Sequence, residues 1–354
     1  MRKIIILFFL IPFLFGSGKK EEARSKVYFT KDISADGVMK VFQQFQNKVE
    51  GKVAIKLHFG EEGNKNFLSP DLIKKLTKEL DATLVETNVL YVSKRRYTES
   101  HIELARRHGF DFAPIDILND EGEIEIPVDF KHFKKIRVGS HLDNYETLIV
   151  FTHAKGHIMA GIGGAIKNVS MGLASIAGKM GMHASSIPKY NPNSCISCGK
   201  CVPECPGNAI SIDPLVIDVD KCIGCGKCIG ACPTRAFNVP WGSTNIDVFQ
   251  ERIAEYAKGI TDYKKNIIYI NVLANISKSC DCDSWAPKPF MDDIGILAST
   301  DIVAIDAASY DLIDKNHDCE DTFKEQNSVS GRNHINYAYE IGLGNKEYEL
   351  IEIY

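Results

Sequence analysis

One cysteine spacing occurs twice in this chain and constrains its folding more than any other feature. The segments CISCGKCVPECP, from Cys195 to Pro206, and CIGCGKCIGACP, from Cys222 to Pro233, both follow the pattern C-x2-C-x2-C-x3-C-P. They hold eight of the eleven cysteines in the chain. So many thiols at one short spacing need a common partner, and that partner decides what this part of the chain folds around.

Two possible partners fit this spacing poorly. A disulfide needs a particular separation and torsion between two cysteines, whereas thiols two residues apart in a Gly-containing loop point toward a common centre. A tetrahedral zinc site usually draws two close pairs from separate knuckles. The observed pattern is instead that of bacterial ferredoxins, in which the fourth cysteine of each run ligates the other cluster. We therefore predict two [4Fe-4S] clusters, with zinc and disulfides as the alternatives.

The cross-ligation rule assigns each cysteine to one cluster. The predicted ligands are Cys195, Cys198, Cys201 and Cys232 for cluster 1, and Cys222, Cys225, Cys228 and Cys205 for cluster 2. Gly199 and Gly226 stand at equivalent places, where backbone N–H groups can approach cluster sulfides. Between the two runs, AISIDPLVIDVD predicts two short strands around a turn at Asp213 and Pro214.

The first 25 residues differ from the rest of the chain. Arg2 and Lys3 precede the apolar run IIILFFLIPFLF, which small residues follow as far as Gly18. Twelve apolar residues are too few to span a bilayer but are typical of a secretory signal. We expect export to a periplasmic or other extracytoplasmic location. The alternatives are an uncleaved end that touches the membrane and a cytoplasmic protein.

On both sides of the cysteines, strand and helix signals alternate. Strands are predicted at 52–59, 82–87, 147–153, 266–273 and 348–353, and helices at 70–80, 101–109, 247–258 and 301–313. The fold class is α/β, with an open, mostly parallel sheet that carries helices on both faces. A ferredoxin-like α+β module interrupts it. The predicted divisions are an export segment at 1–25, the first part of the α/β domain at 26–189, the module at 190–242 and the second part at 243–354.

Charge limits the kinds of partner that the chain can bind. The net charge of -4 gives no indication of a nucleic-acid partner. Within residues 190–242, four basic side chains balance four acidic ones. A diffusing electron carrier often uses a surface of one sign to steer encounters, so this balance favours a relay inside the molecule.

Three stretches outside the module carry candidate functional residues. KLHFGEEGN places Lys56 and His58 at the carboxyl end of a strand, where open α/β sheets bind ligands. FTHAKGHIMAGIGGAIKN follows another strand, and its glycines and lysines are typical of an anion site. Its candidates are His153, Lys155, His157, Gly161, Gly163, Gly164 and Lys167. A structural histidine in the first stretch and glycines that serve close packing in the second are the alternatives.

The third stretch, SCDCDSW, holds Cys280 and Cys282 one residue apart. Thiols this close do not readily bridge each other, so we expect an additional metal site, a third redox centre or a substrate contact. Two reduced thiols without a role are the alternative.

Together, KLHFGE, ETNVLY, HAKGH, GIGGAIKN, GLASIAGK, the cysteine module and CDCD followed by DIGILASTDIVAIDAAS resemble the iron-sulfur centre proteins called domain of unknown function 362. The resemblance runs from about Lys52 to Ile313. It implies a ferredoxin-containing protein with two [4Fe-4S] clusters, and it implies no settled activity.

The predicted function is an electron-transfer protein, and a candidate oxidoreductase, that relays electrons through two clusters to a site on the α/β domain. Lys56, Lys155, His157 and Lys167 would bind an anionic group, and His58 or His153 would donate a proton. The expected partners are a redox protein, a small-molecule substrate or both. One alternative is a ferredoxin-like carrier whose α/β domain only docks a partner protein. Another is a purely structural role for the clusters.

Overall fold

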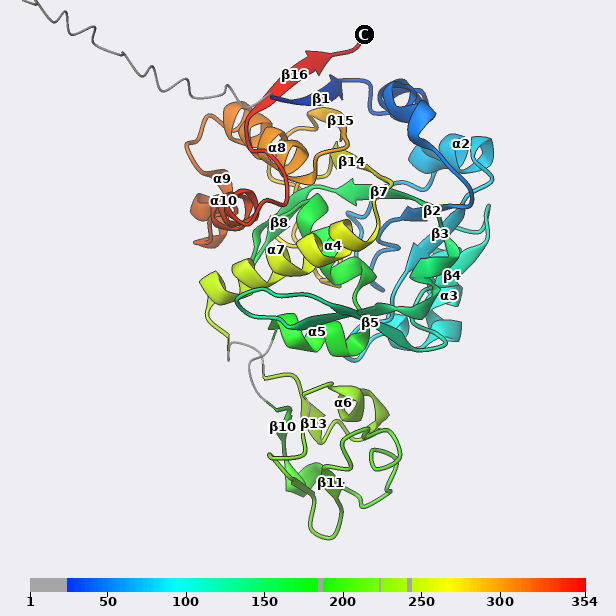
Figure 1. The fold of residues 1–354 in the computed structure, drawn as a ribbon, viewed down its shortest axis with the longest axis vertical. Helices are drawn as coiled ribbons and strands as arrows, with labels where there is room; N and C mark the ends of the chain where they lie inside the picture. Colours follow the sequence, from blue (N-terminus) through cyan, green and yellow to red (C-terminus); the bar gives the residue numbers. More distant parts are fainter. Residues whose placement is uncertain (1–23, 184–186, 223, 241–243) are drawn as a thin grey trace, which may run out of the picture.

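The computed structural model describes residues 24–183, 187–222, 224–240 and 244–354. The predicted export segment, up to residue 23, lies outside this range. Within the described residues, no helix combines the length and the apolar character needed to cross a membrane. The chain forms a large α/β domain and a smaller unit built from residues between α5 and α7 (Figure 1).

One eight-stranded sheet organises the α/β domain. Its strands, in spatial order, are β16 (Tyr348–Glu352), β1 (Ser25–Thr30), β15 (Gly295–Ser299), β14 (Ile267–Leu273), β7 (Thr147–His153), β2 (Val53–Lys56), β3 (Thr83–Glu86) and β4 (Ile115–Ile117). Strand β15 runs antiparallel to β1 and β14, and every other neighbouring pair is parallel. The prediction of a mostly parallel sheet is confirmed.

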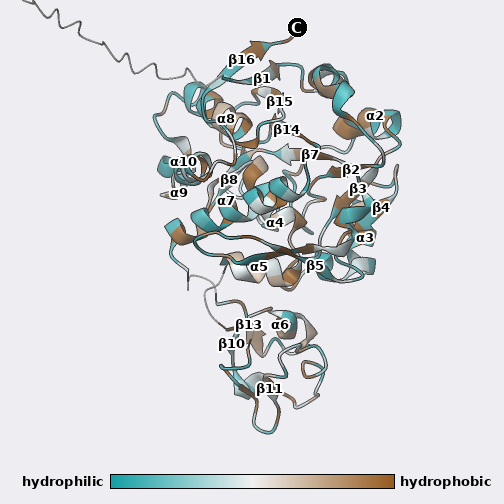
Figure 2. Ribbon diagram, viewed as in Figure 1, coloured by the Kyte–Doolittle hydropathy of each residue, from teal (hydrophilic) through white to brown (hydrophobic). Residues whose placement is uncertain are grey.

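Helices cover both faces of the sheet, as predicted. In β7, Leu148 and Val150 face one hydrophobic cluster, and Ile149 and Phe151 face the other, because successive side chains of a strand point in opposite directions. The first cluster includes residues of α4 (Ala165–Leu173), α7 (Ile246–Tyr263), α8 (Ile302–Asn316) and α10 (Arg332–Glu340). The second includes residues of α1 (Ala35–Phe42), α2 (Asp71–Glu79) and α3 (Thr98–Arg107). Figure 2 shows the strands β2 and β3 as hydrophobic and the helix α7 as mixed along its length.

The predicted helices and strands form close to the places expected from their hydrophobic patterns. Helix α3 ends next to Gly109, whose φ of 91° belongs to the left-handed region that glycine tolerates best. Its N–H donates to the Arg106 carbonyl at 2.9 Å, which closes the last turn. The remaining helices and strands of this domain are β5 (Glu123–Pro127), β6 (Lys135–Gly139), β8 (Lys155–His157), β9 (Gly161–Gly163), α5 (Ile176–His183) and α9 (Thr322–Asn327).

Among its described residues, the small unit contains two short antiparallel strand pairs, one α-helix and a 3-10 turn at Pro192–Ser194. The strand β10 (Lys189–Tyr190) pairs with β13 (Phe237–Asn238), and β11 (Ile210–Ser211) pairs with β12 (Val216–Ile217). The helix is α6 (Lys227–Ala231). The hairpin predicted around Asp213 and Pro214 is confirmed by the second pair.

The small unit contacts the α/β domain through the segment after β3 and through α5. Leu90 and Met180, from these two places, belong to the hydrophobic cluster of the small unit. The Tyr97 hydroxyl donates a 2.7 Å hydrogen bond to the Gly230 carbonyl in α6. These contacts bring the cysteine-bearing unit against the part of the domain that carries the polar strand ends.

Candidate active site

A cavity of about 490 Å³ lies at the carboxyl ends of β2, β3 and β7. Lys56, Glu86 and His153 are the last residues of these strands, and all three line the cavity. Ligands of open α/β sheets bind at this edge. The other cationic and imidazole side chains of its wall are His58, Arg95, Lys155, His157, Lys167, Lys179 and His183. The cavity thus collects the lysines and histidines that the sequence indicated.

Glu86 anchors one side of the cavity through a buried ion network. Arg95 Nη2 donates to both carboxylate oxygens of Glu86, at 2.7 and 2.9 Å, and Lys56 Nζ lies 3.8 Å away. Burial would raise the pKa of Glu86, but the positive charges of Arg95 and Lys56 outweigh it and hold that pKa well below its usual value. Glu86 is therefore ionised, and its charge is paired with Arg95 and Lys56.

Lys56 is fully buried, and its ammonium group makes two hydrogen bonds to protein acceptors. Its Nζ donates to the Leu57 carbonyl at 2.7 Å and to Asn168 Oδ1 at 3.0 Å. Burial lowers the pKa of Lys56 to about 8, although the charge of Glu86 partly opposes this. Lys56 therefore changes charge close to neutral pH.

Asp281 organises the opposite side. Its carboxylate accepts hydrogen bonds from His153 Nδ1 at 3.0 Å and from Lys155 Nζ at 2.9 Å. Burial would raise the pKa of Asp281, but His153 and Lys155 hold it well below its usual value. His153 Nε2 faces the Ala274 carbonyl at 2.7 Å. Both ring nitrogens of His153 thus donate to acceptors, which leaves neither free to give a proton to a ligand.

Two lysines of the cavity have no carboxylate partner among the described residues. Lys179 Nζ donates to the Ala174 carbonyl at 2.7 Å and to the Thr87 hydroxyl. Lys167 makes neither a hydrogen bond nor an ion pair within the described part of the chain. Burial, together with the charge of Lys155, lowers the pKa of Lys167 to about 7. These two amines are therefore buried without a counter-charge from the described side chains, and burial lowers the pKa of both.

His58 and His157 are both held with one nitrogen toward backbone donors. His58 Nδ1 accepts from Gly60 N at 3.0 Å, and His157 Nδ1 accepts from Ala160 N at 3.0 Å and Met159 N at 3.2 Å. Burial holds the pKa of each ring well below its usual value. Each ring is therefore neutral with its proton on Nε2, because Nδ1 acts as the acceptor.

The glycines of the GIGG stretch do not cradle an anion as we expected. The backbone N–H groups of Ala165 and Ile166, which begin α4, donate to the Asp306 carboxylate at 2.7 and 2.9 Å. A Cβ on Gly164 would meet the same carboxylate, and a Cβ on Gly161 would meet the backbone of Gly331. These glycines allow close packing, although Gly163 and Gly164 still line the cavity.

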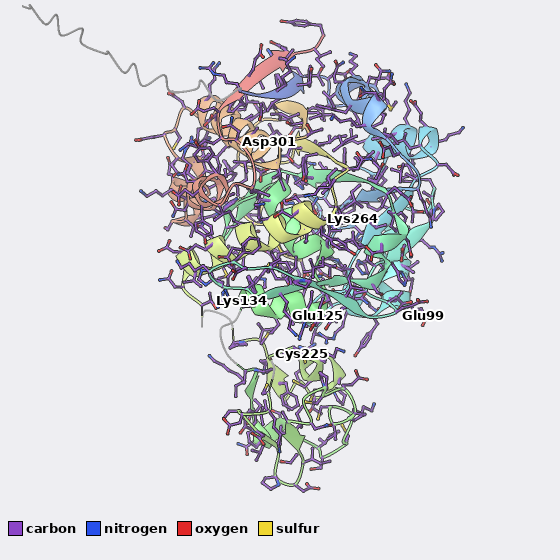
Figure 3. The ribbon with its side chains drawn as sticks, viewed as in Figure 1. Glu99, Glu125, Lys134, Cys225, Lys264 and Asp301 are labelled. Atoms are coloured by element: carbon purple, nitrogen blue, oxygen red, sulfur yellow. A yellow bond between two sulfur atoms is a disulfide. The ribbon has the colours of Figure 1, made fainter. Side chains whose placement is uncertain are left out.

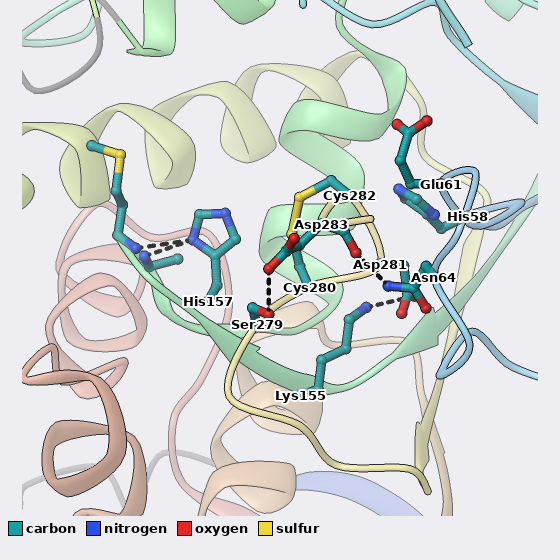
Figure 4. Close-up of a disulfide and its surroundings, with 12 residues drawn as sticks. His58, Glu61, Asn64, Lys155, His157, Ser279, Cys280, Asp281, Cys282 and Asp283 are labelled. Atoms are coloured by element: carbon teal, nitrogen blue, oxygen red, sulfur yellow. Dashed lines mark hydrogen bonds and ion pairs between the residues drawn. A yellow bond between two sulfur atoms is a disulfide. The ribbon is translucent and has the colours of Figure 1, made fainter. Parts of the chain in front are cut away.

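Cys280 and Cys282 form a disulfide, so the expectation that they do not bridge was wrong (Figure 4). The physical reason is a turn in which Asp283 N donates to the Cys280 carbonyl at 3.0 Å. This turn brings the two Cα atoms to 5.3 Å, inside the range that disulfides require. One nitrogen of His157 and the two sulfur atoms lie within 4.8 Å of one another.

The eight repeated cysteines are free thiols that gather in two groups of the small unit. Cys205, Cys222, Cys225 and Cys228 line one small cavity, and these are the four residues predicted for cluster 2. Cys195, Cys198 and Cys232 are electrostatic neighbours of Cys201 and complete the set predicted for cluster 1. Backbone N–H groups of Ala209 and Ala236 donate to Cys205 Sγ and Cys232 Sγ, both at 3.2 Å.

Sequence reasoning missed two acidic members of the site. Glu61 accepts hydrogen bonds from the Ser93 hydroxyl at 2.6 Å and the Tyr91 hydroxyl at 3.1 Å, and it lies 3.6 Å from Arg95. Asp306 comes from α8, far along the chain from the helix that it caps. In the sequence, the only indication of Glu61 was that it is a charged residue directly after Gly60. The only indication of Asp306 was that it is a charged residue within an otherwise apolar helix.

Two solved structures are similar to this chain, and both similarities are weak. The lactate racemase apoprotein from Thermoanaerobacterium thermosaccharolyticum shares 13% identity at a TM-score of 0.40, over 80% of this chain and 56% of that one. A protein from Thermotoga maritima shares 9% identity at a TM-score of 0.42, over 81% and 59% of the two chains. This chain thus spans less than three fifths of either. No curated protein matches it. The family profile described as "Domain of unknown function (DUF362)" matches residues 53–311.

Proposed function

We propose a function on the premise that this chain belongs to the DUF362 family, which its residues 53–311 match. The description of the family names no activity, so the proposal depends on the residues of this chain. The protein is an iron-sulfur electron-transfer protein and a redox enzyme that acts on a small anion bound in the cavity of the α/β domain. The observation that carries this proposal is the proximity of Leu90, which lines the cavity with the lysines, to Gly226, which lines the small cavity with the cysteines.

The donor set of the small unit fits two [4Fe-4S] clusters. Four free thiols around one small cavity, and four more gathered near Cys201, match the ligand number and type that two such clusters need. Backbone N–H groups directed at cysteine sulfurs are the contacts that tune such sites. When bound, the clusters supply one-electron transfer.

The two cavities approach each other at Leu90 and Gly226. The Leu90 side chain lines the large cavity and also belongs to the hydrophobic cluster of the small unit. A Cβ on Gly226, the residue after Cys225, would lie 3.0 Å from Leu90 Cδ1. Figure 3 shows Cys225 on the side of the small unit that faces the α/β domain. This proximity supports a functional connection between the cysteines and the large cavity.

The cavity is suited to an anion because two of its lysines have no carboxylate partner among the described residues, although Asp283 also lines it. Glu86 and Asp281 are engaged by Arg95 and Lys155, whereas Lys167 has no partner among the described residues. An anion near Lys167 and Lys179 would gain Coulombic energy that burial strengthens. It would also raise the lowered pKa values of these lysines, because a nearby negative charge favours the protonated form.

Hydrogen bonding to the bound anion falls to His58 or His157 rather than to His153. The Nε2–H of His58 and of His157 remains available, because backbone N–H groups occupy Nδ1 in each ring. Both rings line the cavity. Since both nitrogens of His153 are already used, its role is to hold Asp281 in place.

A second candidate function is an electron carrier whose α/β domain only docks a partner protein. The specific observation in its favour is a set of exposed apolar side chains on the small unit, which are Ile196, Val202, Val216 and Val219. Exposed apolar side chains of this kind are typical of surfaces that bind another protein. In this case the carrier would react with its partner, and the cavity would bind no substrate.

Anaerobic iron and sulfide analysis with redox-monitored EPR tests the proposal first. We expect about eight irons per chain and two interacting reducible [4Fe-4S] signals. Zinc, or no iron after careful reconstitution, would contradict the electron-transfer function. Titration with small carboxylates, phosphate and sulfate then separates the two candidates. Anion binding that Lys167→Met abolishes supports the enzyme, whereas cluster oxidation only in the presence of a partner protein supports the carrier.

A further inference from the structure

We propose that Cys280 and Cys282 are a redox-active dithiol–disulfide pair, a two-electron centre in the wall of the cavity. This inference rests on the proposed electron-transfer function and gives it a site. The two cysteines are in contact with the cavity, and they face His157 across a short distance. A bridge between residues so close in sequence closes only a tiny loop, which adds little to folding stability. Its position in the cavity is better explained by chemistry.

Hydrogen bonds from other parts of the chain hold the loop that carries the two cysteines. Asp281, between the two cysteines, is buried against His153 and Lys155, and its backbone carbonyl accepts from Glu61 N at 3.0 Å. Asn64 Nδ2 donates to the Asp283 carbonyl at 2.8 Å. These bonds do not depend on the S–S bond. The loop can therefore keep both sulfur atoms at the cavity in the oxidised and in the reduced state.

The surroundings of the pair favour thiolate chemistry. The cationic Lys155 and Lys167 line the same cavity. A thiolate, rather than a thiol, is the reactive form of cysteine, and nearby cations stabilise it. Cys280 is nearly buried, with 5% of its surface exposed, whereas Cys282 is more open. Cys282 is thus the sulfur that a ligand in the cavity reaches first.

A metal site made of Cys280, Cys282 and His157 agrees less well with the hydrogen bonds. A histidine that binds metal through one nitrogen normally donates the N–H of its other nitrogen to an acceptor. His157 Nδ1 faces two backbone N–H donors, those of Met159 and Ala160. This arrangement keeps the ring proton on Nε2, where it points away from metal binding and toward proton exchange.

The proposed step is a balanced two-electron reduction. The S–S bond breaks, two electrons and two protons are taken up, and two thiols form. The electrons come one at a time from a low-potential donor of the ferredoxin class, by way of the small unit. The protons come from solvent that enters the cavity, which His157 lines.

An anaerobic reductive titration of the full chain, with reconstituted iron, tests this proposal. Dithionite is added to the wild type and to the variant Cys280→Ser/Cys282→Ser, and the thiols are then alkylated and mapped by mass spectrometry. We expect the wild type to take up two more electron equivalents than the variant and to gain label at both cysteines. The control Cys319→Ser should titrate as the wild type does, because this free thiol contacts Glu325 outside the cavity.

The outcomes separate this inference from the proposed function. If the variant takes up no electrons, the clusters are missing and the proposed function itself fails. If the wild type and the variant take up the same number of equivalents with normal cluster signals, only the redox pair is overturned. One tightly bound metal ion that is lost with the two serines would also overturn it.

Discussion

At the scale of single residues, Lys167 is where charge in the cavity is least compensated. It has no hydrogen-bond or ion-pair partner within the described residues, and its lowered pKa of about 7 reports the cost of burial. The titratable and charged groups that influence it from neighbouring elements are Lys56, Arg95, Lys155, His157, Lys179, His183 and Asp281. A buried lysine with a strongly lowered pKa costs folding stability, and such groups are typical of ligand-binding sites.

The first prediction follows from that cost. Lys167→Met should stabilise the unliganded protein at pH 7 by about 1–3 kcal/mol, since one pKa unit corresponds to about 1.4 kcal/mol and partial exposure reduces the effect. The unfolded chain keeps a lysine pKa near 10.5, so between about pH 7 and 10.5 it binds more protons than the folded state. The gain should therefore be largest at or below pH 7 and vanish toward pH 10.5.

Chemical denaturation of both proteins at several pH values measures this gain. The exposed Lys48→Met is the matched control and should show no such pH dependence. An equal gain at pH 7 and pH 10 would contradict a buried charge at Lys167.

The second prediction concerns Gly164, where packing leaves no room for a side chain. Gly164→Ala should lower stability by about 1–3 kcal/mol, because its Cβ would meet the Asp306 carboxylate in a filled space. Thermal unfolding of the full chain measures the loss. Gly163→Ala is the neighbouring control, since its Cβ would first meet the Lys155 carbonyl at an ordinary 3.6 Å. Equal losses at the two positions would show that Asp306 gives way.

At the scale of elements, α4 depends on a cap supplied by another helix. Asp306, in α8, accepts from Ala165 N and Ile166 N through different carboxylate oxygens and from Asn271 Nδ2 at 2.8 Å. Burial raises the pKa of Asp306 to about 6. The folded state binds this proton more tightly than the unfolded chain, so stability from this group decreases as pH rises from about 4 to 6.

The third prediction is that Asp306→Ala lowers stability by about 1–2 kcal/mol near pH 5 and by less at pH 7. An alanine loses both capping bonds, but it also removes a buried charge whose cost grows as pH rises through the pKa of about 6, which offsets part of the loss at pH 7. Urea denaturation measures the change. Asp71→Asn should change stability little, because its exposed carboxylate makes only a surface pair with Lys74. No difference between the two variants would contradict the capping role of Asp306.

The same elements show how far sequence patterns reach. Hydrophobic runs such as those of β2 and β7 predicted the strands, and the strand ends predicted Lys56, Lys155 and His157 at one cavity. The position of β15 between β1 and β14 was not predictable, because antiparallel insertion depends on pairing partners far along the chain. Asp306 was missed for the same reason, since it caps a helix 141 residues away.

The prediction that Cys280 and Cys282 do not bridge failed for a different reason. A sequence spacing of two suggests an extended separation, whereas the turn at Cys280 shortens the Cα distance to 5.3 Å. Backbone turns of this kind are set by hydrogen bonds with distant residues, here from Asn64 Nδ2 to the Asp283 carbonyl and from Glu61 N to the Asp281 carbonyl. Pairwise spacing alone therefore cannot exclude a bridge.

At the scale of the whole molecule, the contact between the small unit and the α/β domain should control electron transfer. The Arg96 guanidinium packs so closely on Gly230, in α6, that a side chain at position 230 would collide with it. Arg96 Nη1 also donates a 2.5 Å hydrogen bond to the Leu90 carbonyl. Arg96 thus connects α6 to the residue that separates the cysteines from the cavity. Gly230 lies between Cys228 and Cys232, and Cys228 is an electrostatic neighbour of Arg96.

The fourth prediction is that Gly230→Leu leaves the iron content unchanged but slows electron transfer to the cavity. The leucine side chain would displace Arg96 and open the contact, while the eight cysteines stay in place. We expect an unchanged iron content and unchanged EPR signals, together with at least tenfold slower reduction of the Cys280–Cys282 disulfide. Rapid-quench alkylation after mixing with a reductant measures this rate. Gly181→Ala, in α5, is the control, because its Cβ would make only an ordinary 3.5 Å contact with Phe133.

The pattern of results decides what the contact does. A slow rate in Gly230→Leu alone means that electrons pass through the contact at Leu90 and Arg96. A normal rate with the contact open would mean that a donor reduces the cavity directly from solvent, and the small unit would then serve some other acceptor. Loss of iron in Gly230→Leu would instead mean that the α/β domain supports folding of the small unit, which makes the two parts one cooperative structure.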